Sequence, residues 1–274
     1  MTSMNDLRDS EMMFRFRHFR FSENEEHKRE PERILCDSQL WCGNPRAFND
    51  PFDCRPNLVM SNIPVAEAVQ RTEAMIQRRG LSANHPHAVT ARNAARDGKF
   101  GSAEMYEALR LGMQAAIDRS SVCCFNRVWD DPRMWAQYAD DHKGYCLAFE
   151  LDGDWPEDAV PMPVKYSEER PEIDLAVDTM EDRDAAWHYV EGSIFTKSSH
   201  WQGEQEVRVF RHETPPGLLA FPPSALKAVY LGLQITPENR ERLIAAIEQR
   251  EQRIPAYQLH LHARRYAFEL EQIN

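Results

Sequence analysis

Apolar and polar residues alternate in three segments of the chain, as they do in strands that bury one face. Residues 14–17 read Phe-Arg-Phe-Arg, and residues 145–151 place an apolar side chain at every second position. In residues 204–210, Val207 and Val209 lie opposite a row of charged side chains. We expect a strand in each segment, with residues 204–210 inside or at the edge of the main sheet.

Short apolar runs predict further strands, because four to eight apolar residues between turn signals are typical of buried strands. These runs are residues 40–42, 122–125, 229–231 and 257–262.

Helical spacing appears in two long segments. The first begins after Asn62, with Pro64 in its first turn, and ends near Gly80. In the second, Ser102 can cap a helix on which Met105 and Leu109 begin an apolar stripe. Both are expected to pack against the rest of the fold.

Capping residues place three other features. Asp131 and Pro132 predict the start of a short aromatic helix, and Gly144 predicts its end in a left-handed cap. Thr236 predicts the start of a later helix. The polar residues 84–101 predict a connector between the two long helices.

These elements together predict an α+β fold with a central mixed or antiparallel sheet and peripheral helices. The chain shows no internal repeat and no low-complexity linker. We therefore expect one α+β domain over residues 14–274, preceded by an N-terminal tail over residues 1–13.

Composition narrows the class of protein. The chain has 274 residues, and none of its apolar runs approaches the ~20 residues that span a bilayer. Its first ten residues are polar, and its six cysteines form no C-x-x-C pair, so we expect a cytoplasmic protein with reduced thiols.

The formal net charge of −11 makes broad nucleic-acid binding unlikely, because such binding needs a basic surface. A local basic patch could still be formed by Arg15, Arg17, His18 and Arg20. A solvated strand face would give the same pattern.

Glu204, Glu206 and Arg208 form the most informative charged group, since they are expected on one strand face. The simplest interpretation is a solvated edge with an ion pair. The alternative is a functional carboxylate pair.

Two other groups have both a structural and a functional interpretation. In Asn49-Asp50-Pro51 a side chain can close a turn, although Asp50 could also contact a ligand. Trp135 and Tyr138 fit a helix packed on the sheet, and His142 would follow its end. They could equally form an aromatic wall with a polar contact for a flat heterocycle.

An ordered set of motifs resembles the bacterial domain-of-unknown-function family 2971. The set comprises residues 48–53, Cys124-Phe125, residues 134–139, residues 141–145, residues 164–166, Lys197, Trp201, Glu204, Glu206, Arg208 and Leu231-Gly232. The chain departs from the family pattern at Asn126, where a hydroxyl residue is usual, and at the Phe-Arg first strand.

The Glu204-Gln205-Glu206 segment also resembles the end of an ADP-ribosyltransferase site. That resemblance implies NAD as substrate, Glu206 as the catalytic carboxylate and Glu204 as the group that orients an acceptor. A fixed carboxylate would stabilise the oxocarbenium character that develops when the nicotinamide-ribose bond breaks.

The same resemblance implies a set of cofactor-binding residues and no metal. Arg15 or Arg17 would meet phosphates, and the ring-binding and polar contacts would come from Trp41, Asp50, Trp135, Tyr138 and His142. We expect the first-strand arginine, Asp50, Trp135, Tyr138 and Glu206 to line one pocket, with a nucleotide-like small molecule and an unknown acceptor as partners.

Two alternatives stay open. The first is a non-catalytic nucleotide-sensing or protein-interaction module. The second is a metal-dependent nuclease or hydrolase, for which His200, Glu204 and Glu206, or His260 and His262, would supply ligands.

Overall fold

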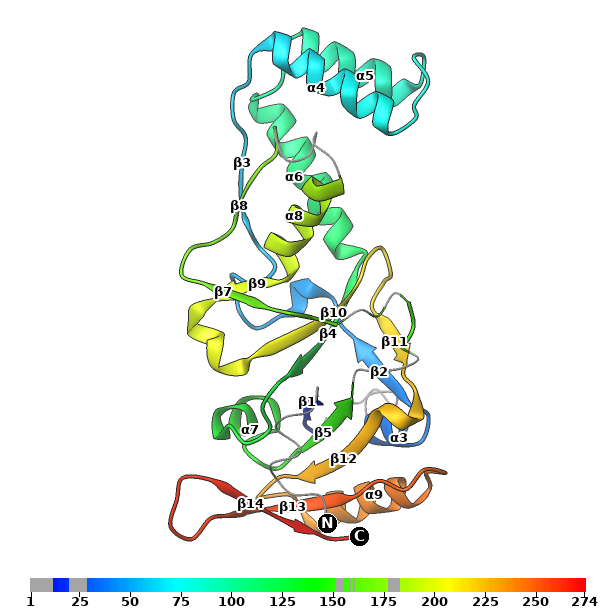
Figure 1. Ribbon diagram of the computed structural model, residues 1–274, viewed down its shortest axis with the longest axis vertical. Helices are drawn as coiled ribbons and strands as arrows, with labels where there is room; N and C mark the ends of the chain where they lie inside the picture. The colour runs from blue at the N-terminus through cyan, green and yellow to red at the C-terminus, as the bar shows by residue number, and fades with distance from the viewer. Residues whose placement is uncertain (1–11, 20–28, 151–154, 158, 160, 177–182) are drawn as a thin grey trace.

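The computed structural model describes residues 12–19, 29–150, 155–157, 159, 161–176 and 183–274, and of residues 183–188 it describes the backbone. The molecule is elongated, with a β-rich body at one end and a pair of helices at the other (Figure 1). Residues 1–11 of the predicted tail, Arg20 of the predicted basic patch and Leu151 lie outside the described residues.

One eight-stranded mixed sheet forms the body, in the order β14-β13-β12-β5-β1-β4-β10-β6. In chain order its strands are β1 (Met12–Arg17), β4 (Ser121–Asn126), β5 (Tyr145–Glu150), β6 (Pro161–Pro163), β10 (Glu206–Arg211), β12 (Leu226–Leu231), β13 (Ala256–Leu261) and β14 (Phe268–Gln272). Neighbours are antiparallel except β12 and β13, which run parallel and are joined through helix α9 (Pro237–Glu248). The predicted α+β fold is confirmed.

Strand β1 spans Met12–Arg17 and so includes two residues, Met12 and Met13, that the sequence assigned to the N-terminal tail. Met12 and Met13 are buried and pair with β5 opposite Glu150 and Phe149. They extend the strand with apolar side chains on both faces of the sheet, so the alternation of apolar and basic residues, which starts at Phe14, does not mark them.

Strand β5 is covered on both faces, whereas its sequence predicted one. Tyr145 and Leu147 join a core with α9 and α3 (Glu30–Leu35). Cys146 and Ala148 join a second core with α7 (Pro132–Tyr138). Small side chains give a weak hydropathy signal, yet they suit the close approach of a helix to a sheet.

Three two-stranded sheets surround the main one. They are β2 (Gln39–Cys42) with β11 (Gly217–Ala220), β3 (Asn57–Val59) with β8 (Glu172–Asp174), and β7 (Lys165–Ser167) with β9 (Thr196–Ser198). Helix α8 (Arg183–Ile194) leads into β9. Most of these strands have three residues, too few for alternation to be recognised in the sequence.

The far end of the molecule consists of α4 (Val65–Arg78) and α5 (Pro86–Arg96), with α6 (Ala103–Asp118) leading back to the body (Figure 1). Helix α5 replaces the connector that residues 84–101 predicted. Its buried residues are all alanines, which produce little apolar contrast. The predicted cap of α6 is confirmed, because Met105 N donates to Ser102 Oγ at 3.2 Å.

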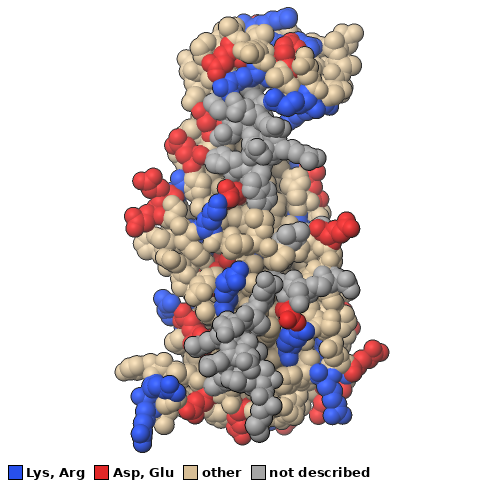
Figure 2. Space-filling model, viewed as in Figure 1, with Lys and Arg blue, Asp and Glu red and all other residues tan. Residues whose placement is uncertain are grey.

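The space-filling view shows acidic and basic side chains mixed over one face of the molecule (Figure 2). Within the described residues, no helix combines the length and apolarity needed to cross a membrane.

Gly144 does not form the predicted left-handed cap. Helix α7 ends at Tyr138, and the left-handed residues are Asp140, Asp141 and His142, with φ values of 49°, 49° and 68°. A Cβ at Gly144 would instead collide with the backbone carbonyl oxygen of Arg17. Glycine is required there because β1 passes directly against it.

This close approach predicts that Gly144→Ala lowers the free energy of unfolding by about 1–3 kcal/mol, the usual cost of overpacking. Gly112→Ala is the matched control, because a Cβ in the middle of α6 meets no atom within 4 Å. The control should raise stability by about 0.5–1 kcal/mol, since alanine favours helix. Denaturant unfolding measures both, and equal effects would contradict the packing argument.

Candidate functional site

Arg208 is fully buried in β10 and holds the candidate site together. Alternation along β10 puts Val207 and Val209 into the main core and Glu206 and Arg208 on the other face. The Arg208 guanidinium donates to both oxygens of Asp53, at 2.9 and 2.6 Å, and to both oxygens of Glu206, at 2.8 and 2.9 Å. The predicted charged face is confirmed for Glu206 and Arg208, but it is buried instead of solvated, and the strand begins at Glu206, so the prediction that Glu204 lies on it is wrong.

Lys197 on β9 brings a second cation to the same carboxylates. Its Nζ lies 2.5 Å from Glu204 Oε2, 3.2 Å from Glu206 Oε2 and 3.7 Å from Asp53 Oδ2. It also lies 4.9 Å from the centre of the Trp201 ring. We call Asp53, Lys197, Glu204, Glu206 and Arg208 the ion network.

Glu204 reaches the ion network from outside the strand. It ends a 3-10 helix, and the next residue, Gln205, takes a left-handed conformation with φ of 45°. The Tyr138 hydroxyl donates to Glu204 Oε1 at 2.6 Å, and Asn126 donates to the Glu204 backbone oxygen at 3.0 Å. Helix α7 and strand β4 therefore hold the glutamate that the irregular turn presents.

Electrostatics keep the ion network charged. Burial alone would raise the pKa of Glu206, but the charge and hydrogen bonds of Arg208, with the charge of Lys197, lower it to about 2. Burial opposes the charge on Lys197, yet Glu206, Glu204 and Asp53 raise its pKa. The two cations and three carboxylates leave one formal negative charge in the ion network.

Burial and the charge of Glu204 raise the pKa of Tyr138. The neighbouring Tyr166 hydroxyl accepts a hydrogen bond from Glu206 N at 2.8 Å, and burial raises the pKa of this phenol to about 12. Both phenols therefore stay protonated at neutral pH.

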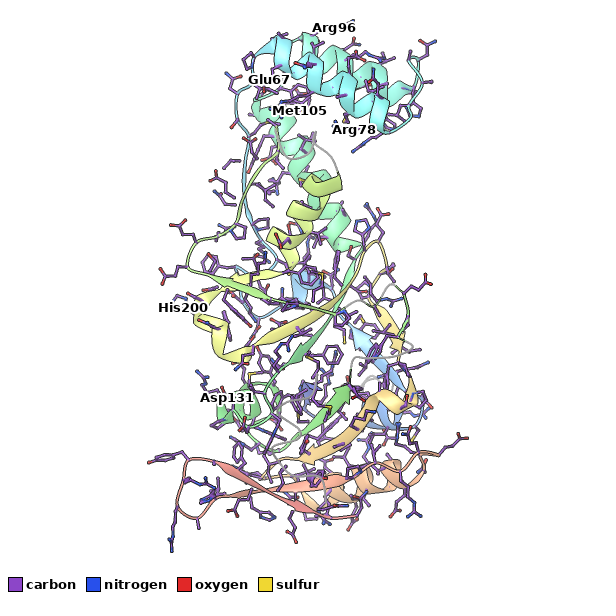
Figure 3. All side chains as sticks on the ribbon, viewed as in Figure 1. Glu67, Arg78, Arg96, Met105, Asp131 and His200 are labelled. Carbon is purple, nitrogen blue, oxygen red and sulfur yellow. The ribbon has the colours of Figure 1, made fainter. Side chains whose placement is uncertain are left out.

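A pocket of about 460 Å³ opens beside the ion network. Three chain segments line it, contributing Asp50, Pro51, Phe52, Arg55, Pro56, then Ser167, Glu168, Glu169, Arg170, Pro171, and finally Gly192, Thr196, Lys197, Ser198, His200 and Trp201. Lys197 belongs to both the pocket wall and the ion network. His200 lies at the outer side of this region, and Asp131 marks the start of α7 nearer the body (Figure 3).

Asp50 closes the predicted turn, since Phe52 N donates to its Oδ1 at 2.9 Å. Its other carboxylate oxygen is buried without a hydrogen-bond partner among the described residues. The side chain is only 5% exposed. Phe52, at the end of the turn, is 59% exposed and forms an aromatic part of the pocket wall.

The structure brings some of the predicted site residues together. Tyr138 contacts Glu204, Lys197 links Glu204 to Glu206, and Asp50 lines the adjoining pocket.

Trp135 and His142 pack against each other and do not line the pocket. The Trp135 ring is fully buried, its Nε1 donates to Trp129 O at 2.7 Å, and it stacks on His142. The structural interpretation of this pair therefore has direct support.

Arg15, Arg17 and Trp41 are also not among the residues that line the pocket, so the expected convergence in one pocket is only partial. Arg15 donates to Cys123 Sγ and to Trp41 O, and Arg17 pairs with Glu30. The alternation of apolar and basic residues predicted that both arginines lie in a strand, but it could not predict which side chains they contact. Their binding of phosphate stays a prediction.

The sequence pattern indicates no separate role for Asp53, Lys197 or Trp201, which appear only within the motifs shared with the family. A buried arginine needs carboxylate partners from other segments. Asp53 directly follows the Asp50 turn, which could have marked it as a candidate partner for Arg208.

Among the described residues, no group of three or more histidine, cysteine, aspartate or glutamate side chains is arranged to hold a metal ion. His260 and His262 instead lie beside Glu271 and Glu269 on the β13–β14 hairpin.

Residues 134–209 match the model of a family described as "Protein of unknown function (DUF2971)". The match supports the resemblance found in the sequence, and it spans four members of the ion network, all except Asp53. No curated protein and no solved structure matches the chain significantly.

Glu206→Gln should lower the free energy of unfolding at neutral pH by about 3–5 kcal/mol, because it leaves buried cations short of a carboxylate. Since folding lowers the pKa of Glu206 from 4.5 to about 2, its stabilisation is complete above pH 4.5 and is lost as the pH falls toward 2. The difference between wild type and variant should therefore shrink over that range.

Denaturant unfolding between pH 2 and pH 7 tests this pH dependence. Glu107→Gln removes an exposed carboxylate paired with Arg110 and is the control, with an expected cost below about 1 kcal/mol. A difference between wild type and Glu206→Gln that does not change with pH would contradict the assignment.

Proposed function

We propose that this protein binds a nucleotide-like small molecule in the pocket beside the ion network. The observation that carries the proposal is a pocket with an exposed aromatic ring, Phe52, and a second ring, Trp201, beside a buried cation. Flat heterocycles bind by stacking on such side chains. A nucleotide-sensing module needs only this recognition and no chemical step.

The charged residues around the pocket limit the net charge of the ligand that it can bind. Three acidic residues, Asp50, Glu168 and Glu169, balance three basic ones, Arg55, Arg170 and Lys197. Lys197 is already paired with carboxylates, and Arg170 donates to the backbone oxygens of Arg55 and Pro56. A ligand of low net charge, such as a nucleoside, a nucleoside monophosphate or a dinucleotide with a cationic ring, suits this balance better than a nucleoside triphosphate does.

Asp50 would accept a hydrogen bond from the edge of the bound ring. Its Oδ2 has no hydrogen-bond partner among the described residues, and a buried acceptor gains most from a ligand that supplies an N–H donor. Amino and carboxamide groups of heterocycles provide such donors.

Removal of the exposed ring in Phe52→Ala should weaken nucleoside binding by about 1–3 kcal/mol without loss of stability. Leu111→Ala is the control, because Leu111 is 57% exposed on α6 and outside the pocket. Titration calorimetry with nucleosides and nucleoside monophosphates measures the effect. No binding at millimolar ligand, or equal binding by wild type and Phe52→Ala, would contradict the proposed site.

A narrower proposal is that the ligand is NAD and that the protein consumes it, by ADP-ribosyl transfer or by hydrolysis. The supporting observation is that Glu206 is held ionised beside the pocket by Arg208 and Lys197. A fixed carboxylate is what an oxocarbenium-like transition state requires.

This reaction requires a rearrangement within the ion network. Both Glu206 oxygens already accept hydrogen bonds, so Lys197 must turn from Glu206 toward Glu204 before a ribose hydroxyl can take its place. Glu204 lies 2.5 Å from the same ammonium and would keep it paired. In the same proposal, Glu204 also orients the acceptor.

In this narrower proposal Glu206→Gln should lower the rate of nicotinamide release by roughly 10²-fold, since it removes transition-state electrostatic stabilisation. The assay would follow nicotinamide and labelled ADP-ribose with protein, nucleic-acid and small-molecule acceptors, at a temperature where circular dichroism shows the variant folded. Glu204→Gln should mainly reduce transfer to acceptors. Equal nicotinamide release by wild type and Glu206→Gln would remove Glu206 from the mechanism.

A further inference from the structure

Cys42 on β2 and Cys123 on β4 form a cross-strand pair at the junction of the β2–β11 sheet and the main sheet. Next to them, Gly43 and Val122 exchange both backbone hydrogen bonds, each 2.9 Å long, as an antiparallel bridge. The adjoining pair, Cys42 and Cys123, is therefore a non-hydrogen-bonded pair. Such pairs have Cα atoms about 4.5 Å apart, inside the range of about 4.4–6.8 Å that a disulfide spans.

The two thiols already face each other. Both residues are fully buried in the same hydrophobic core, and the register set by the Gly43–Val122 bridge puts their side chains on the same face. Cys124, the next residue along β4, faces the opposite side of the sheet and is the strand partner of Arg208. Contact between Cys42 and Cys123 therefore comes from the strand register and does not depend on the ion network.

Arg15 of β1 makes this pair chemically unusual. Its buried guanidinium donates to Cys123 Sγ and, at 2.8 Å, to Trp41 O. A buried cation favours a negative charge on neighbouring sulfur. The neighbouring Cys123 thiol and the charge of Arg15 lower the pKa of Cys42 against the effect of burial, whereas burial raises the pKa of Cys123.

We propose that Cys42 and Cys123 are an oxidative modification site, at which a small peroxide converts the two thiols to a reversible disulfide. The Cys42 thiolate attacks the peroxide O–O bond, gives a sulfenic acid and releases hydroxide, which takes up a proton to become water. Cys123 then attacks the Cys42 sulfur, loses its proton and displaces the hydroxyl as a second water. Two thiols lose two electrons, and one peroxide gains them.

The disulfide would fix the β2–β11 sheet to the main sheet and leave Arg15 without its thiol partner. Both sulfur atoms are buried, so a small peroxide should react faster than a bulky disulfide such as oxidised glutathione. Reduction by dithiothreitol should restore both thiols.

The test uses the full chain with Cys36→Ser, because Cys36 is the one exposed cysteine among the six. Native protein is treated with hydrogen peroxide, its remaining thiols are counted, and its peptides are mapped without reduction. We expect two of the five remaining thiols to disappear, a peptide that links Cys42 to Cys123, and a mass loss of two hydrogens that dithiothreitol reverses.

Two further variants separate the site from general oxidation. Cys124→Ser should keep the linkage, whereas Cys42→Ser should leave Cys123 a thiol at the same dose. The proposal is overturned if other cysteines pair instead. It is also overturned if Cys42 and Cys123 stay reduced in the folded protein at a peroxide dose that converts its methionines to sulfoxide. Both outcomes can be read in the Cys36→Ser chain, even where Cys42→Ser does not fold.

Discussion

The burial of one guanidinium, that of Arg208, is the constraint on which the rest of the site depends. A charge removed from water costs several kcal/mol unless anions and carbonyls replace its hydration. Here the replacements come from Asp53, from Glu206 and from the backbone oxygen of Ile194, 2.5 Å away. The turn after residue 48, the end of α8 and strand β10 must therefore meet at one point. Lys197 adds a second cation and joins the ion network to the pocket wall.

The pocket follows from this arrangement. Lys197 is held by three carboxylates, so the wall that it shares with Trp201 has little freedom to move. Another lining segment begins at Asp50, three residues before the carboxylate that binds Arg208. A ligand ring would therefore enter between two segments that the same buried charge fixes. Preorganisation of this kind favours recognition, because the protein loses little entropy on binding.

The sequence predicted six of the eight strands of the main sheet, the turn at Asp50 and the charged pair Glu206 and Arg208 of β10, since each depends on local periodicity or turn chemistry. It did not predict that the charged pair is buried, because alternation gives the same pattern whether a face meets water or a second layer of protein. It also missed α5, whose buried residues are alanines, and the role of Gly144, which depends on a carbonyl of β1 that is distant in sequence. The partners of a buried charge are often distant in sequence, so only the fold could show that Asp53 binds Arg208.

A double-mutant cycle in denaturant unfolding, with Asp53→Asn, Arg208→Met and the double variant, tests this dependence most directly. If Arg208 joins the two segments, the double variant should be more stable than the sum of the single effects predicts, by about 1–3 kcal/mol, the range for residues of one ionic network. Additive effects, within about 0.5 kcal/mol, would contradict the claim that the buried arginine organises the site.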